Sequence, residues 1–177
     1  MLPKQPRLAQ WQPLELLKYC FNLKEIGENL PVPQVSVFLD NHPGSLSEVI
    51  GKLDQNQIRI FALSIAEAGE FGLVRLIVED PAKATKLLED AEFNLAKSRK
   101  NIEVAVVMIT EKDKVSRITK VLGDSGLNID YAYSSAVHMD GKFSLVLRAN
   151  DLEKAEKTLK ENGVSILSLA EIKQHFQ

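Results

Sequence analysis

The stretch Asp40-Asn41-His42-Pro43-Gly44-Ser45-Leu46 constrains the fold of this 177-residue chain more than any other. An apolar run, Val35–Leu39, precedes it and an amphipathic run, Leu46–Leu53, follows, an order that predicts a strand, a tight turn and a helix. The free N–H groups and positive dipole end of a helix start attract a carboxylate or phosphate. Pro43 has a φ suited to a first helical position, and Gly44 lets a ligand approach the backbone. The stretch therefore predicts a small anion-binding loop.

The same order of apolar runs occurs twice in the chain. Leu46 and Ile60 recur as Val115 and Ile129 at a spacing of 69 residues (115 − 46). After the middle hairpin the spacing grows to 71 residues, because Asp80-Pro-Ala-Lys-Ala matches Asp151-Leu-Glu-Lys-Ala (151 − 80). A length change confined to a turn is typical of a duplicated domain.

Each copy reads strand, helix, strand, strand, helix, strand, which is the ferredoxin-like βαββαβ unit. The elements expected in the first copy are 35–39, 45–55, 58–67, 71–79, 81–91 and 93–97, and those in the second are 103–109, 114–124, 127–137, 142–148, 152–161 and 164–170. Asp80 and either Asn150 or Asp151 are expected to cap the second helix of each copy, with Pro81 at the first helical position and Gly163 closing the last helix.

The sequence predicts an α+β fold of three parts: an N-terminal arm over 1–33, a first domain over 34–99 and a second over 100–177. Right-handed crossovers place both helices of a copy on one face of its antiparallel sheet, with the first and third strands central. The second strands are open edges, and an exposed edge invites pairing. We expect the two domains to pair side by side through 60–66 and 131–136 into one eight-stranded antiparallel sheet.

At this point the residues carry a family resemblance. Asn41-His42-Pro43-Gly44-Ser45-Leu46 resembles the Asn-x-Pro-Gly-x-Leu turn of ACT domains, which are small βαββαβ regulatory modules that bind amino acids at the interface of paired sheets. The segment Asn128–Ser134 resembles the second strand of stand-alone tandem ACT proteins, and the likeness extends over about residues 34 to 172. It implies that a free amino acid or similar small carboxylate binds between the domains, with Asn41 bonding the amino-acid backbone. The implied ligand-binding residues are Asn41, His42, Pro43, Gly44, Ser45, Leu46, Tyr131, Tyr133, Ser134 and Ser135.

The second copy departs from this turn. It has Thr110-Glu111-Lys112-Asp113-Lys114-Val115 where the first has Asn41 to Leu46, so proline and glycine are both gone. Glu111 and Asp113 put carboxylates where an anion would bind, and Thr110 with Asp113 resembles a capping box. We expect the second copy to be degenerate in its own site and to supply the opposite wall for the first.

Several of these residues have a second interpretation. Tyr131 and Tyr133 point to one face of their strand, where they either pack or meet a ligand. Ser134 and Ser135 are either solvent-exposed at an edge or hydrogen-bonded to a ligand. His42 is better explained as an exposed turn residue than as a base.

Composition excludes several classes of function. The chain is 45% hydrophobic and 26% charged with a net charge of −2, which gives no drive toward nucleic acid. Its apolar runs are too short to span a membrane, and the single cysteine, Cys20, suits a reducing cytoplasm. We find no catalytic constellation, metal-ligand spacing or cofactor fingerprint, and so expect a regulatory binding protein rather than an enzyme. The alternative is a ferredoxin-like module that binds RNA or protein, although the expected central strands offer only Phe38, Phe71 and Phe143 for base stacking.

The N-terminal 33 residues hold five of the seven prolines and the only tryptophan, Trp11. Leu14, Leu17 and Phe21 could form a stripe on one helical face. This arm either packs on the body, is a leader, or binds a partner. We also expect a twofold dimer, in which the uncovered sheet faces, assigned Val37 and Leu76 by alternation, stack together or are covered by the arm. A regulated enzyme or regulator is a possible partner.

Overall fold

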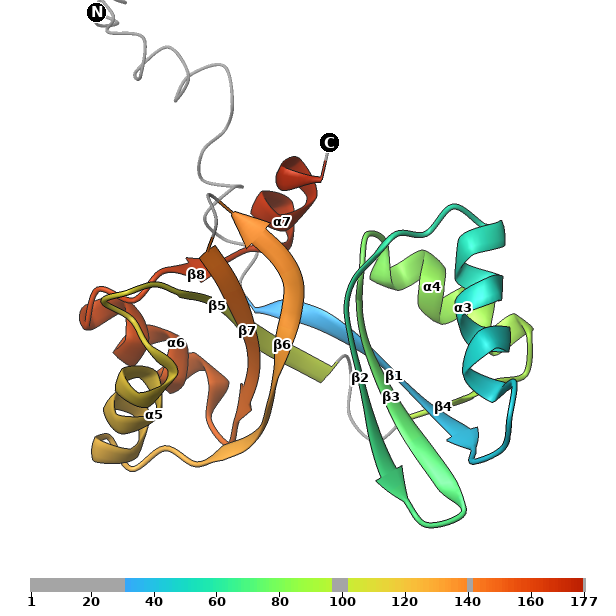
Figure 1. The fold of residues 1–177 in the computed structure, drawn as a ribbon, viewed down its shortest axis with the longest axis horizontal. Helices are drawn as coiled ribbons and strands as arrows, with labels where there is room; N and C mark the ends of the chain where they lie inside the picture. The colour runs from blue at the N-terminus through green and yellow to red at the C-terminus, as the bar shows by residue number, and fades with distance from the viewer. Residues whose placement is uncertain (1–30, 97–101, 140–141, 177) are drawn as a thin grey trace, which may run out of the picture.

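A computed structural model describes residues 31–96, 102–139 and 142–176 (Figure 1). The first domain consists of β1 (Val32–Asp40), α3 (Ser45–Gln55), β2 (Ile60–Ala68), β3 (Phe71–Val78), α4 (Pro81–Asp90) and β4 (Asn94–Leu95). The second consists of β5 (Ile102–Ile109), α5 (Val115–Asp124), β6 (Ile129–Met139), β7 (Lys142–Ala149), α6 (Leu152–Glu161), β8 (Ile166–Leu167) and α7 (Leu169–His175). The α+β class and the duplicated βαββαβ order are confirmed. The expected arm over residues 1–30 lies outside the described residues.

The predicted helix starts at the second helix of each domain are confirmed. The Asp80 and Asp151 carboxylates accept hydrogen bonds from the backbone N–H groups of Lys83 and Lys154, at 2.9 and 3.0 Å. Pro81 stands in the first turn of α4, and Gly163 follows α6 with a φ of +72°. These ends depend on short-range contacts, which is why the sequence specifies them.

The end of the chain differs from its prediction as a strand over 164–170. Only Ile166–Leu167 pair as β8, and the helix α7 follows at once. Ser168 begins that helix with a capping box: its hydroxyl accepts from the Glu171 N–H at 3.2 Å, and the Glu171 carboxylate accepts from the Ser168 N–H at 2.7 Å. The Ser-x-x-Glu spacing was the signal that identifies this helix start.

Each sheet is covered by helices on one face only. In the first domain α3 and α4 bury Val37 and Leu76 in a core with Val49, Leu53 and Leu88. The assignment of Val37 and Leu76 to the uncovered face was therefore wrong, because side chains alternate along a strand and an error of one residue exchanges the faces. Phe38 and its cross-strand partner Leu73 lie on the uncovered face instead.

The eight-stranded sheet is confirmed, but the strands expected to join the domains are wrong. The sheet follows the order β2-β3-β1-β5-β7-β6, so the second strands, β2 and β6, are its two ends. The joining ladder is antiparallel and pairs Val32 with Val104, Pro33 with Glu103 and Gln34 with Ile102. The short fourth strands explain this choice: β4 and β8 pair with only two residues each of β1 and β5, and leave the starts of those strands with an open edge.

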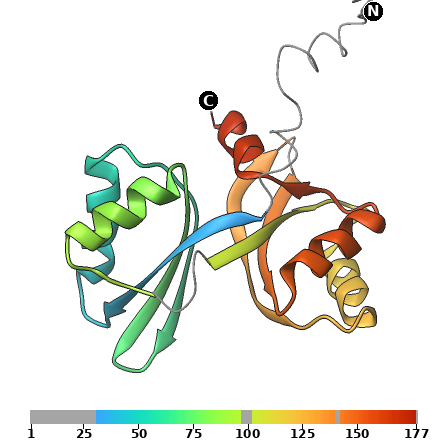
Figure 2. The ribbon, with the colours of Figure 1, turned by 180° about the vertical axis from the view of Figure 1, so that it is seen from behind.

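The two uncovered faces turn toward each other, while the helices α3 to α6 lie on the outside (Figures 1 and 2). Between them is a third apolar cluster, here called the inter-domain core: Val32, Phe61, Ala62, Ile77, Val104, Val106, Met108, Val146, Leu167 and Ile172. The helix α7 lies at the junction and contributes Ile172, whose side chain is fully buried. The strands β2 and β6 are close but unpaired, linked by a hydrogen bond of 3.4 Å from the Ser135 hydroxyl to the Phe61 carbonyl.

Candidate functional site

The Asn41–Leu46 loop joins the end of β1 to α3. The helix begins at Ser45 with Gly44 as its N-cap, so Pro43 lies two residues before the first helical position at which we expected it. Gly44 has a φ of +100°, a conformation that residues with a Cβ rarely adopt, which is the local reason for glycine here. Asn41 ties the loop to the β2–β3 hairpin: its N–H donates to the Glu70 carbonyl at 2.9 Å and its side-chain amide to the Gly69 carbonyl at 3.3 Å.

A second contact fixes the turn from within. The ring of His42 lies 3.0 Å, measured at Nδ1, from the hydroxyl of Ser45. Ser45 is buried and His42 exposed, so the histidine covers the serine as a turn residue. This geometry gives His42 a structural part and places no reacting group beside it.

The start of α3 is open to solvent. Within the described residues no side chain caps this helix, and the N–H groups of its first turn have no acceptor inside the helix. A Cβ built on Gly44 would meet no atom within 4 Å. The positive end of the helix dipole is thus accessible to a small anion.

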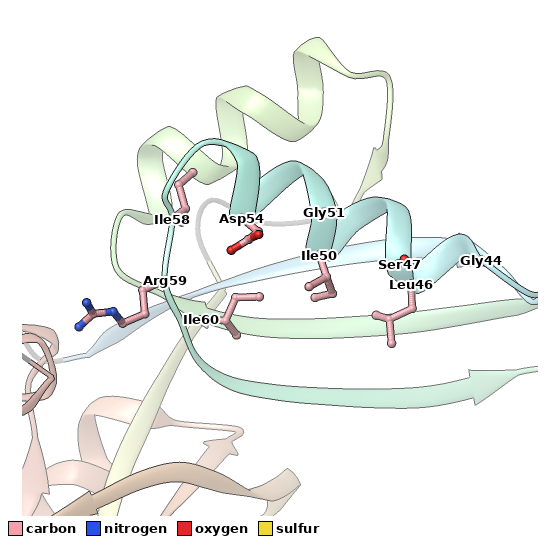
Figure 3. A pocket seen from close by; sticks show the side chains of 9 residues that line it. All are labelled: Gly44, Leu46, Ser47, Ile50, Gly51, Asp54, Ile58, Arg59 and Ile60. Carbon is pink, nitrogen blue, oxygen red and sulfur yellow. The ribbon is translucent and has the colours of Figure 1, made fainter.

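An open groove of about 760 Å³ runs from this helix start along α3 to the beginning of β2 (Figure 3). Leu46, Ile50 and Ile60 give it apolar walls, and Asp54 and Arg59 lie toward its other end. The full lining is Gly44, Leu46, Ser47, Ile50, Gly51, Asp54, Ile58, Arg59 and Ile60, all from the first domain. Our sequence reasoning stopped at Leu46 and missed the rest, although the spacing of Ser47 and Gly51 and of Ile50 and Asp54 places each pair on one helix face.

The corresponding loop of the second domain is filled by its own carboxylate. Asp113 is 6% exposed, its N–H donates to the Thr110 hydroxyl at 2.8 Å, and its carboxylate pairs with Arg117. The helix α5 begins at Val115 with Lys114 as its N-cap, so the Thr110–Asp113 contact closes the turn before the helix, and its interpretation as a capping box was wrong. Arg117 also donates to the Asn162 carbonyl at 2.7 Å, which fixes it over the loop.

Tyr131 and Tyr133 share one face of β6, as predicted, with ring centroids 6.5 Å apart. The buried amide of Gln34 bridges their hydroxyls: it donates to Tyr131 at 2.8 Å and accepts from Tyr133 at 3.1 Å. The Arg75 guanidinium stands 4.2 Å from the centre of the Tyr131 ring. Burial raises the pKa of both phenols above the ordinary value, with a larger rise for Tyr133. The four side chains form a polar contact between the domains, here called the tyrosine bridge.

The structure does not bring the tyrosines to the loop. Gln34 and Asn41 are at opposite ends of β1, about 23 Å apart at roughly 3.3 Å per residue. Of the two predicted serines, Ser134 is exposed and Ser135 is buried against Phe61. The predicted residues therefore fall into two groups, the loop residues 41–46 beside the groove and the β6 residues between the domains.

Two further searches concern the described part of the chain only. In it, three or more His, Cys, Asp or Glu side chains nowhere gather as they would around a metal ion. Of the helices described, none combines the length and apolar character needed to cross a membrane.

This architecture, two ferredoxin-like domains in tandem with a helix-start groove on the first, defines a class that comparison with known proteins identifies. The model of the ACT domain pair family matches residues 30–174, so the chain belongs to that family. The crystal structure of protein BT0572 from Bacteroides thetaiotaomicron is 30% identical, with a TM-score of 0.72 over 81% of this chain and 96% of that one. The regulatory subunit of aspartate kinase from Thermus thermophilus, at 16% identity, shares the fold with a TM-score of 0.53 over 75% of this chain and 94% of that one. No curated protein matches the chain in sequence.

Proposed function

We propose that this protein is a regulatory module of the cytoplasm that binds a free amino acid or similar small carboxylate in the groove beside α3. The uncapped helix start opening into that groove carries the proposal, because it offers backbone N–H donors and apolar walls in one place. The ligand carboxylate binds the N–H groups of Leu46 and Ser47, and its apolar part contacts Ile50 and Ile60. The protein acts by binding, without catalysis, and passes the signal to a regulated enzyme or regulator.

The choice of the first domain over the second follows from their loops. Gly44 leaves the first helix start open, whereas Asp113 places a buried carboxylate, already paired with Arg117, in the second. A second anion there would meet an existing negative charge. We therefore assign one ligand to each chain.

Replacing Ser47 by aspartate should weaken ligand binding about tenfold or more while leaving the fold intact. The new carboxylate would stand in the first turn of α3, where it stabilises the helix by about 0.3–1 kcal/mol and competes with the ligand for the same N–H groups. A thermal-shift screen of the twenty amino acids identifies the ligand, and calorimetry then compares its affinity for the two proteins.

The matched control for this change is Ser116→Asp, at the equivalent position of α5 (116 − 47 = 69). Both serines are exposed near a helix start, so both variants should melt at or slightly above the wild-type temperature. Only Ser47→Asp should lose affinity. Equal affinity of wild type and a folded Ser47→Asp protein would place the ligand elsewhere.

We also propose that two chains associate through the outer edge of β2. This strand ends the sheet, and Leu63 and Ile65, 39% and 52% exposed, stand on its helix-covered side next to the groove. An open strand edge with apolar side chains favours pairing with a second copy, which would close the groove from outside. Ile65→Lys should then convert a dimer into a monomer at micromolar concentration in sedimentation experiments.

Ser134→Lys is the control, because Ser134 occupies the same position on β6 (134 − 65 = 69) and is also exposed. It should leave the dimer intact. A monomeric wild type, or a dimer that only Ser134→Lys dissociates, would contradict the assignment to β2.

The RNA-binding alternative has less support. Phe143 lies opposite Ile109, whose side chain packs on the helix-side core, so it does not extend an aromatic surface on the uncovered face. In the second domain that face is occupied by the inter-domain core. Bases would have little aromatic surface on which to stack.

A further inference from the structure

The uncovered face of the first domain is apolar well beyond the inter-domain core. Phe38 on β1 pairs with Leu73 on β3, and Phe71 follows two residues earlier on the same face. Phe38 is 38% and Phe71 49% exposed. We call these three residues the hairpin-end patch, because they lie toward the β2–β3 turn, away from the second domain.

The second domain has no such exposed area among its described residues on the corresponding face. Val104, Val106, Met108 and Val146 are all at most 6% exposed, since the first domain and α7 cover them. The two domains are thus covered unequally. Exposed aromatic side chains gathered on a sheet face are typical of a surface that binds something.

We propose that the chain's own N-terminal segment, through Trp11, Leu14, Leu17 and Phe21, covers the hairpin-end patch. Thirty residues precede Pro31, and they enter the structure at the start of β1, the strand that carries Phe38. Phe38 is seven residues from Pro31, about 23 Å along the strand at roughly 3.3 Å per residue. The ten residues between Phe21 and Pro31 can span about 33 Å when extended, so the apolar positions reach the patch.

Charge selects this segment over a second copy of the patch. Asp40 stands opposite Phe71 in the ladder, Glu67 opposite Gly72, and Glu70 lies in the adjoining turn. Two patches stacked on a twofold axis would bring these carboxylates together, and like charges oppose each other. The N-terminal segment instead carries Arg7, Lys18 and Lys24 among its apolar residues, so its basic side chains can meet the acidic rim.

Tethering acts in the same direction. A segment joined to β1 by a short linker is present at an effective concentration in the millimolar range, whereas a second molecule is available at micromolar concentration. The tethered segment therefore has an advantage of about a thousandfold for contacts of equal quality.

Trp11, the only tryptophan of the chain, reports on this contact directly. In the full-length protein its fluorescence should be blue-shifted and protected from acrylamide relative to the same protein in urea. Phe71→Lys, or Phe38→Lys if the first variant does not fold, should shift the emission and the quenching toward the unfolded values while the circular dichroism stays native.

Two controls separate this face from others. Ile65→Lys changes the opposite face of the same sheet, and Phe143→Lys changes an exposed phenylalanine of the second domain. Neither should alter the Trp11 signal. The proposal is overturned if Trp11 is as accessible in the native protein as in urea, or if a control rather than the patch variants moves its signal. It is also overturned if the patch variants dissociate a dimer without affecting Trp11, which would make a second copy the occupant.

Discussion

Replacing Phe61 by alanine is expected to lower the free energy of unfolding by about 3–5 kcal/mol, the range for removing a fully buried aromatic side chain. Phe61 is 1% exposed, and its ring lies 5.1 Å from that of Phe176. It belongs to the inter-domain core, so the loss falls on the contact between the domains as well as on β2. Urea titration followed by circular dichroism measures the change.

The exposed Phe143, truncated in the same way, should change the free energy of unfolding by about 0.5 kcal/mol or less. A Phe61→Ala protein that loses less than about 1 kcal/mol would show that the ring is not buried between the domains. Separate melting of two domains in Phe61→Ala, against one transition in wild type, would add that this core couples them.

Gln34→Leu should lower the free energy of unfolding by about 2–3 kcal/mol, because it leaves two tyrosine hydroxyls without their partner inside the protein. The Gln34 side chain is 4% exposed and contacts Tyr131, Tyr133 and the Ser36 hydroxyl, the last at 3.0 Å. Leucine has nearly the same volume but no polar atom. The penalty therefore comes from unsatisfied hydroxyls rather than from a cavity.

Removing the hydroxyls tests that cause. In the triple variant Gln34→Leu, Tyr131→Phe, Tyr133→Phe the polar partners disappear together, so the triple variant should be more stable than Gln34→Leu alone. Gln55→Leu, at an exposed position on α3, should change stability by about 0.5 kcal/mol or less. Failure of the two tyrosine changes to restore stability would mean that Gln34 acts through packing alone.

These two experiments concern a contact that the sequence did not reveal. Tyr131 and Tyr133 were correctly placed on one face of a strand, since side chains alternate over short distances. Their partner, Gln34, is about a hundred residues away in the chain, and its position depends on which strands join the domains. No local pattern in Gln34 or its neighbours marks it as that partner.

The loop was predicted more completely than the groove beside it. Gly44, the helix start and the filled loop of the second copy could all be recognised, because each depends on a few consecutive residues. The walls from Ile58, Arg59 and Ile60 come from the strand that follows α3, and helical spacing alone cannot say which strand lies beside a helix. Gly44 also shows why the loops are not interchangeable. Asp113 is its counterpart in the repeat, yet at Gly44 a side chain would have to adopt a φ of +100°.

The sequence by itself determined the α+β class, the two βαββαβ copies, the Asp80 and Asp151 caps and the open helix start at Gly44. All of these follow from periodicity, from capping and turn chemistry, or from the repeat, which are properties of short segments. Only the tertiary structure decided that β1 pairs with β5, that β2 and β6 end the sheet, and that α7 lies at the junction. Those choices depend on competition among edges far apart in the chain. The shortness of β4 and β8 left the starts of β1 and β5 unpaired, and the free energy of that ladder and of the inter-domain core together selected the arrangement.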